Sequence, residues 1–214
     1  MLVSAAFWMA AERGELDPGR RVGVRATPAP GGGGLLESMH SDTELALADL
    51  DLLMLAVSDN AATNVLIDAV GMARVNALAS ELALPGTRLR RRMMDAAAAE
   101  RGEDNTTSAA DMVVLLAALA GESAVSDRAR RRVLAGLAQS QHTDIVPRYL
   151  PFARQRVVAS KQGELEHVRH DVALIDEGDR LVAIAALSAP AAAAEGLARA
   201  AAAAYVRLLD AAED

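Results

Sequence analysis

The sequence pattern of the chain changes at Pro151, and this change restricts the folds that it can adopt. Ahead of Pro151, apolar residues recur at helical spacing between glycine, proline and capping residues. Behind it lie three short runs that predict antiparallel strands, namely RQRVVAS, VRHDVALID and RLVAIAALS. An alanine-rich stretch over residues 190–210 predicts a final helix. The order indicates an α+β fold, with a helical part (residues 1–150) and a three-strand meander with its helix (residues 151–214).

The helical part divides at turn and capping signals. Gly14 and Gly71 are typical of helix ends, Thr43 is typical of a helix start, and Ser108 with Asp111 matches a capping box. A stretch rich in glycine and proline, residues 22–34, predicts a loop. Together these signals predict helices over residues 2–13, 43–56, 60–71, 72–83, 111–120 and 126–138.

The composition excludes several kinds of function. A net charge of −7 and a pI near 5.2 argue against a nucleic-acid partner, which would need a basic face. We interpret the arginine runs 88–92 and 128–132 as solvated helix ends. The chain contains no cysteine, and its four histidines lack a zinc-ligand spacing such as H-E-x-x-H. We therefore expect no disulfide, metal or other cofactor.

The sequence also lacks targeting signals. No strongly apolar run is long enough to predict a membrane span. The first residues, MLVSAAFWMAAERGEL, have no positively charged leader region and so do not predict a signal peptide. Localisation and oligomeric state stay open.

Two short motifs carry the chemistry. Ser58, Asp59 and Asn60 form an S-D-N tripeptide between two predicted helices. Alone it is a weak signal, because Asp and Asn are common capping residues in such turns. About a hundred residues later, Lys161 stands before Gln162 and Gly163, and it is the only lysine in the chain. A chain that otherwise uses arginine has kept a compact point charge at this one position.

In this order, S-D-N followed by K-Q-G, the chain resembles class A β-lactamases and penicillin-binding serine hydrolases, whose motifs are S-x-x-K, S-D-N and K-T-G. The resemblance covers nearly the whole chain from about residue 5. It implies a single β-lactamase/transpeptidase-like domain, in which a helical subdomain adjoins an antiparallel sheet flanked by helices. It rests on four ordered segments: residues 43–71, 84–95, 105–116 and 161–175.

The resemblance implies a role for each residue of the two motifs. Such enzymes open a β-lactam or an acyl-D-alanine amide through a serine acyl-enzyme. Ser58 would relay a proton to the leaving nitrogen, and Lys161 would attract the substrate carboxylate. Asn60 would donate its amide to the substrate, while Asp59 would be buried and structural. The implied partner is a small molecule, a β-lactam or a peptidoglycan stem peptide.

The resemblance also implies a substrate-binding strand. Gln162 stands where the family has a hydroxyl residue, and its longer amide would donate from a different position. Gly163 would let the substrate backbone lie along the strand edge. The backbone N–H of Glu164 would be one oxyanion-hole donor. Arg169 or His170 would add positive charge for the carboxylate, or would serve only on the strand surface.

The first family motif, S-x-x-K, is absent. Val158 stands three residues before the only lysine, and Ser4 has no lysine three residues after it. The resemblance places Met1 just after the expected catalytic lysine, so we expect the chain to lack the N-terminal helix and strands of the family. Such a chain would expose a sheet edge and an apolar face, and we expect it to be poorly soluble.

A second departure concerns the glutamate that activates water for deacylation in class A β-lactamases. Residues 93–105 contain no matching E-x-x-L-N pattern. Glu100 and Glu103 are the nearest candidates, and the alternative for both is a solvated loop charge. This departure favours slow deacylation.

Three functions stay open at this stage. The chain can be a β-lactamase-like serine hydrolase that is inactive without its S-x-x-K, with no acylation by penicillin. It can belong to a D-Ala-D-Ala carboxypeptidase or esterase, with a glutaminase as a minor alternative. It can also be a non-catalytic remnant that binds peptidoglycan-like or carboxylate ligands.

Overall fold

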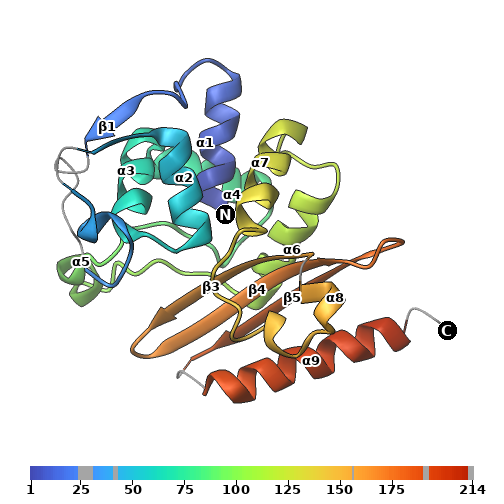
Figure 1. The fold of residues 1–214 in the computed structure, drawn as a ribbon. Coiled ribbons are helices and arrows are strands. Elements are labelled where there is room, and N and C mark those ends of the chain that lie inside the picture. Colours follow the sequence, from blue (N-terminus) through green and yellow to red (C-terminus); the bar gives the residue numbers. More distant parts are fainter. Residues whose placement is uncertain (24–30, 41–42, 156, 190–192, 212–214) are drawn as a thin grey trace.

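The computed structural model describes residues 1–23, 31–40, 43–155, 157–189 and 193–211. A three-stranded antiparallel sheet lies between a group of helices on one face and a long C-terminal helix on the other (Figure 1). The strands of this sheet are β3 (Val158–Leu165), β4 (Val168–Asp176) and β5 (Leu181–Ser188), in that spatial order. The C-terminal helix is α9 (Ala194–Asp210). The fold is therefore α+β, as the sequence predicts.

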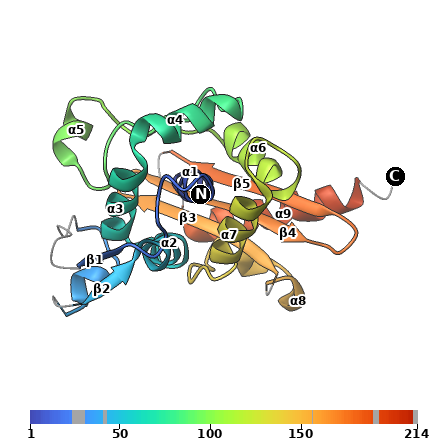
Figure 2. The ribbon, with the colours of Figure 1, turned by 90° about the horizontal axis from the view of Figure 1, so that it is seen from above.

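The remaining helices come mostly from the first part of the chain. Seen from above, they spread over one face of the sheet (Figure 2), except the short helix at Phe152–Gln155, which lies on the side of the C-terminal helix (Figure 1). A short two-stranded sheet, β1 (Arg21–Gly23) with β2 (Glu44–Ala46), lies beside them. The helices are α1 (Leu2–Glu12), α2 (Leu47–Ala56), α3 (Asn60–Val70), α4 (Met72–Glu81), α5 (Ala96–Glu100), α6 (Ala109–Ala120), α7 (Asp127–Leu137) and α8 (Phe152–Gln155).

Two hydrophobic clusters cover the two faces of the sheet. Successive residues of a strand point to opposite faces, so each strand contributes alternate side chains to each cluster. Ala159, Val172 and Leu174 join the large cluster of the helical part. Ile175 and Ile184 pack on the other face against α9. The core of the helical part therefore continues into the sheet.

Helix capping follows the sequence closely in three places. Ser108 Oγ accepts a hydrogen bond from the N–H of Asp111, which is the N-cap half of the predicted capping box, while the Asp111 carboxylate accepts the hydroxyl of Thr87. Ser126 caps α7 in the same way through the N–H of Ala129. Gly71 ends α3 with a φ of +85°, a conformation that glycine adopts without steric cost. The predicted cap at Ser108 and the predicted helix end at Gly71 depend on local chemistry and are confirmed, whereas the cap at Ser126 was not predicted.

The predicted helix start at Thr43 is wrong. Residues Glu44–Ala46 form β2 and pair with Arg21–Gly23, so α2 begins only at Leu47. The same pairing turns the first residues of the predicted 22–34 loop into β1; residues 24–30 of that loop lie outside the described residues. Pairing with a distant segment overrides the local capping preference here.

The first predicted strand is displaced along the chain. Residues Phe152–Gln155 form the short helix α8, and β3 runs from Val158 to Leu165. The β3–β4 register extends to the Leu165–Val168 pair. Lys161 therefore lies in the middle of a strand and not at its end. The last predicted helix begins at Ala194, and residues 190–192 lie outside the described residues.

The interpretation of residues 88–92 as a solvated helix end is wrong, whereas residues 128–132 do lie at the N-terminal end of α7, with Arg128, Arg131 and Arg132 exposed. Residues 88–92 lie between α4 and α5, where Arg88 pairs with Thr106 in an isolated β-bridge. Residues 128–132 lie within α7, and the guanidinium of Arg132 stacks 4.9 Å from the centre of the Trp8 ring. Long arginine side chains here cover apolar or loop surface as well as facing water.

Candidate active site

The S-D-N tripeptide forms the sharp turn between α2 and α3. Ser58 has a φ of +56°, a left-handed conformation that non-glycine residues rarely adopt. Its side chain is half-buried, whereas Asp59, the N-cap of α3, is completely buried. The turn therefore presents a partly accessible hydroxyl from a strained backbone position.

The Asp59 carboxylate holds this turn to the loop before it. One oxygen accepts the N–H of Ala62 at 2.9 Å and caps α3. The other accepts the N–H groups of Leu35 and Leu36 at 2.7 and 2.9 Å. A Cβ at Gly34 would come within 2.5 Å of the same carboxylate, so only glycine fits at this approach. Charged hydrogen bonds to three backbone N–H groups compensate the buried charge.

The structure brings Lys161 to Ser58 across 103 residues of sequence. The Lys161 Nζ donates a hydrogen bond to Ser58 Oγ, and a second one of 2.6 Å to the backbone carbonyl of Gln162. Burial lowers the pKa of Lys161 from 10.5 to about 8, while the nearby Asp171 carboxylate opposes this shift. A point charge on a rigid strand thus faces the hydroxyl of the S-D-N turn.

Asn60 lies next to Ser58 at the start of α3. Its Nδ2 donates to the carbonyl of Gly31 at 3.1 Å. The loop packs tightly on it, because a Cβ at Gly32 would lie 2.9 Å from Asn60 Nδ2 and 2.7 Å from Met94 Sδ. In this conformation the amide holds the glycine-rich loop beside the site.

Gln162 lies on the opposite face of the sheet from Lys161. It is the direct cross-strand partner of Asp171, and both side chains are buried on the side that carries α9. Burial raises the pKa of Asp171 to about 7, against hydrogen bonds from backbone N–H groups such as that of Val146. No role for Asp171 was predicted from the sequence. A lone carboxylate inside the apolar run of a predicted strand is the signal that could have identified it.

The remaining predicted residues of the sheet lie toward the end of β3. Gly163 is exposed, and a Cβ there would meet no atom of the chain within 4 Å. Glu164 forms an ion pair with Arg169 directly across the strands. His170 accepts the N–H of Ser188 through Nδ1 at 3.2 Å. Both Arg169 and His170 therefore make contacts within the sheet.

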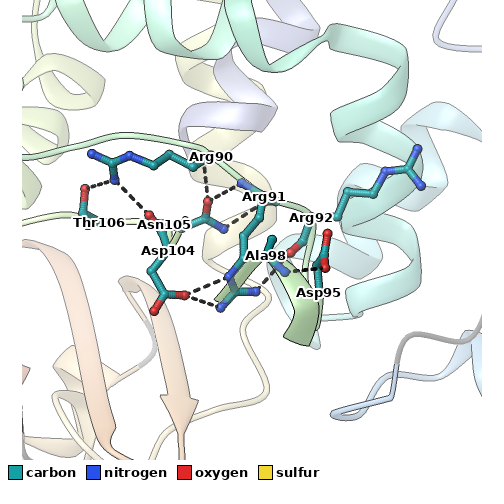
Figure 3. Close-up of polar contacts among 8 residues, drawn as sticks. All are labelled: Arg90, Arg91, Arg92, Asp95, Ala98, Asp104, Asn105 and Thr106. Atoms are coloured by element: carbon teal, nitrogen blue, oxygen red, sulfur yellow. Dashed lines mark hydrogen bonds and ion pairs between the residues drawn. The ribbon is translucent and has the colours of Figure 1, made fainter. Parts of the chain in front are cut away.

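A second loop, residues 84–107, flanks α3. Asn105 organises it by accepting the N–H groups of Arg90 and Arg91 and donating to the carbonyl of Arg91 (Figure 3). Arg91 also pairs with Asp104 at 2.8 Å. The side chain of Asn64 on α3 binds the N–H and the carbonyl of Met93 at 2.7 and 3.2 Å. This loop anchor was not identified from the sequence.

The two loop glutamates lie on the surface. Glu103 forms an exposed ion pair with Arg101 at 2.7 Å, and Glu100 is exposed at the end of α5. Their positions agree with solvated loop charges. Within the described part of the chain, no three His, Asp or Glu side chains gather as metal ligands. None of the described helices is long and apolar enough to cross a membrane.

Taken with the sheet and helices around it, the contact between the S-D-N turn and Lys161 defines a β-lactamase-like protein. The chain aligns with the β-lactamase from Sphaerobacter thermophilus with a TM-score of 0.83 and 28% identity, over 94% of this chain and 76% of that one. PBP-A gives a TM-score of 0.83 at 23% identity, over 98% and 78%. A β-lactamase from Chitinophaga pinensis gives 0.84 at 18% identity, over 100% and 83%.

The chain belongs to the β-lactamase enzyme family, whose model matches residues 1–208. A search of curated proteins finds no match. The predicted family and fold class are confirmed. The division at residue 150 stays a prediction, as do the roles of the individual site residues.

Proposed function

We propose that the site between the S-D-N turn and β3 binds carboxylate-bearing acyl substrates, either β-lactams or acyl-D-alanyl peptides, within a β-lactamase-like serine hydrolase. The contact between Lys161 Nζ and Ser58 Oγ carries this proposal. It places the only lysine of the chain beside a partly accessible hydroxyl. Membership of the β-lactamase family supports a β-lactam type of ligand.

Each residue has a physical role in the proposed site. The Lys161 ammonium attracts the carboxylate in a partly buried setting, where screening by water is weak. Ser58 passes a proton toward the leaving nitrogen. Asn60 donates its amide to the ligand once Gly31 releases it. The exposed Gly163 leaves room for the ligand backbone, and the N–H of Glu164 faces the ligand carbonyl.

Covalent turnover through S-x-x-K is not part of this proposal, because the 214 residues contain no such motif. We expect the chain to bind the ligand and to show no covalent labelling by a fluorescent penicillin. Binding without turnover is also what the non-catalytic alternative requires. The serine-hydrolase proposal and the non-catalytic alternative differ only in whether a nucleophile is supplied from outside these residues.

A carboxypeptidase or esterase is the second candidate. It is favoured by the loop over residues 84–107, where Asn64 holds the backbone of Met93 and where Glu103 forms an exposed ion pair with Arg101. A site without a poised carboxylate would deacylate slowly. Tighter binding of N-acyl-D-Ala-D-Ala than of benzylpenicillin would support this candidate, and the reverse order would support a β-lactamase.

The experiment uses the single lysine as a probe. Protein labelled with ¹³C-lysine gives one side-chain NMR signal, which we expect to shift on titration with benzylpenicillin. The methyl ester of benzylpenicillin lacks the carboxylate and should shift it far less. Equal shifts with both ligands, or none with either, would contradict the proposal.

A matched pair of glycine variants tests the strand edge. Gly163→Ala should weaken ligand binding by about tenfold or more without lowering the melting temperature, because no atom of the chain crowds that position. Gly196→Ala on α9 is equally uncrowded and should leave binding unchanged. Unchanged binding in Gly163→Ala would show that the ligand does not bind along this edge of β3.

A further inference from the structure

Ser58 and Lys161 have the arrangement of a nucleophile with its base. The lysine Nζ is in hydrogen-bond contact with the serine Oγ, and the Gln162 carbonyl fixes the amine from the other side at 2.6 Å. A serine hydroxyl is a weak nucleophile until a neighbouring base removes its proton, and a desolvated lysine can act as that base. Geometry alone therefore allows direct proton transfer between the two side chains.

Lysine acts as a base only when it is neutral. Burial lowers the pKa of Lys161 to about 8, so about one molecule in ten carries the neutral amine at pH 7. Two titratable groups act on it electrostatically, Asp171 from β4 and the α-amino group of Met1 at the start of α1. Asp171 holds the Lys161 pKa up. Burial lowers the pKa of the Met1 amine to about 5, which leaves that amine neutral near pH 7.

Ser58 is held where a nucleophile would need to be. Its φ of +56° presents the side chain from a tight turn directly ahead of the α3 N-terminus. The positive end of α3 favours negative charge developing nearby. The neighbouring Asp59 carboxylate is occupied by three backbone N–H groups and is buried, so it does not compete for the Ser58 proton.

We propose that Ser58 and Lys161 form a nucleophile–base pair that accepts acyl groups from small activated esters, independently of the S-x-x-K motif. Ser58 Oγ attacks the ester carbonyl carbon as its proton passes to Lys161 Nζ. The new Oγ–C bond forms, the bond to the aryl oxygen breaks, and a phenolate leaves. Water then attacks the acyl-serine, releases the carboxylic acid and restores the hydroxyl, while Lys161 gives up its proton to solvent.

The acyl donor must be small. Ser58 is only partly exposed, and Asn60 beside it is tied to Gly31 and packed under Gly32. An acetyl ester needs neither the loop to move nor a carboxylate to be bound. This activity is therefore separate from the proposed binding of β-lactams, and either one can fail without the other.

The test is a stopped-flow reaction of the purified chain with p-nitrophenyl acetate. We expect one equivalent of p-nitrophenolate in an initial burst, and a peptide map with acetyl on Ser58. An acetyl ester on serine is cleaved by neutral hydroxylamine, whereas an acetyl amide on lysine or the α-amine is stable. Acetyl found only on amines, or spread over many serines, would overturn the proposal.

Variants separate the two partners. Ser58→Ala should remove the burst, and Lys161→Met should slow acetylation of Ser58 by about 100-fold. Ser80→Ala is the control, because Ser80 is an exposed serine on α4 whose hydroxyl bonds only its own helix carbonyl at Asn76 in the described structure.

The wild-type rate of Ser58 acetylation should rise with pH and level off above about pH 8. Acetylation of Ser58 at an unchanged rate in a folded Lys161→Met protein would show that Lys161 is not its base. The wild-type peptide map decides the nucleophile even if a variant does not fold.

Discussion

Gln162 lies directly opposite Asp171 on the neighbouring strand, with both side chains buried on the face of the sheet that carries α9. Gln162 Oε1 and Asp171 Oδ1 are both buried, and neither has a hydrogen-bond partner among the described residues. A buried carboxyl oxygen without a donor is better tolerated when the acid is protonated, because the neutral form loses less on leaving water. The arrangement therefore favours a neutral Asp171.

This pair makes stability depend on pH. Burial raises the Asp171 pKa to about 7 in the folded state, above the roughly 3.9 of an unfolded chain. The folded protein then binds the proton more tightly, so this contribution to stability is complete below about pH 4 and is lost as the pH rises through about 7. We expect Asp171→Asn to remove this loss of stability at rising pH, so that the variant is more stable than wild type at about pH 8. Urea unfolding of both proteins at about pH 5 and about pH 8 measures this.

The control for that comparison is Asp144→Asn. Asp144 is an exposed neighbour whose charge acts on Asp171 from a distance, so its loss should change the pH dependence only slightly. An Asp171→Asn protein that is less stable than wild type at about pH 8 would show that the buried carboxylate is charged and that its hydrogen bonds stabilise the fold.

The titration of the single lysine is a second prediction. The ¹³Cε signal of Lys161 should titrate with a midpoint near the pKa of about 8 that burial produces. In Asp171→Asn the midpoint should move to lower pH, because the carboxylate that raises it is gone. NMR of ¹³C-lysine protein reports this without assignment. A wild-type midpoint above about 10 would mean that the amine is solvated.

The cap of α3 gives a third prediction. Asp59→Ala removes a helix cap and leaves the N–H groups of Leu35 and Leu36 without their acceptor, so we expect it to lower the free energy of unfolding by about 3 kcal/mol. Ser126→Ala removes the cap of α7 and an exposed hydrogen bond from the Ser126 hydroxyl to Glu12, and should cost about 1 kcal/mol. Denaturant unfolding compares the two. Equal losses would mean that the loop contacts add nothing.

The packing of α7 against α2 gives a fourth prediction. A Cβ at Gly136 would lie 2.5 Å from Leu55 Cδ1, so Gly136→Ala should destabilise the protein by about 1–3 kcal/mol, although alanine favours helices. Gly196→Ala on α9 meets no atom within 4 Å and should stabilise by about 0.5–1 kcal/mol. Thermal unfolding of the two variants separates the effect of side-chain packing from the effect of helix propensity. A stabilised Gly136→Ala protein would show that α2 and α7 can move apart.

The errors of sequence reading share a physical cause. The start of α2 was predicted from Thr43, but backbone pairing with β1 extends residues 44–46. The first strand was predicted too early, because its end is set by the register with β4 and not by its own residues. In each case the decisive hydrogen bonds come from a distant segment, which a local pattern does not contain.

The sequence by itself determined the α+β order of the elements, the cap at Ser108 and the family, because these depend on side-chain chemistry and on the order of motifs along the chain. Only the tertiary structure decided that Lys161 touches Ser58, and that Gln162 turns away from them to Asp171. Strand alternation and helix packing set which side chains meet across 103 residues, and burial then shifts the pKa values of Lys161 and Asp171. Both effects arise only when the distant parts of the chain are folded together.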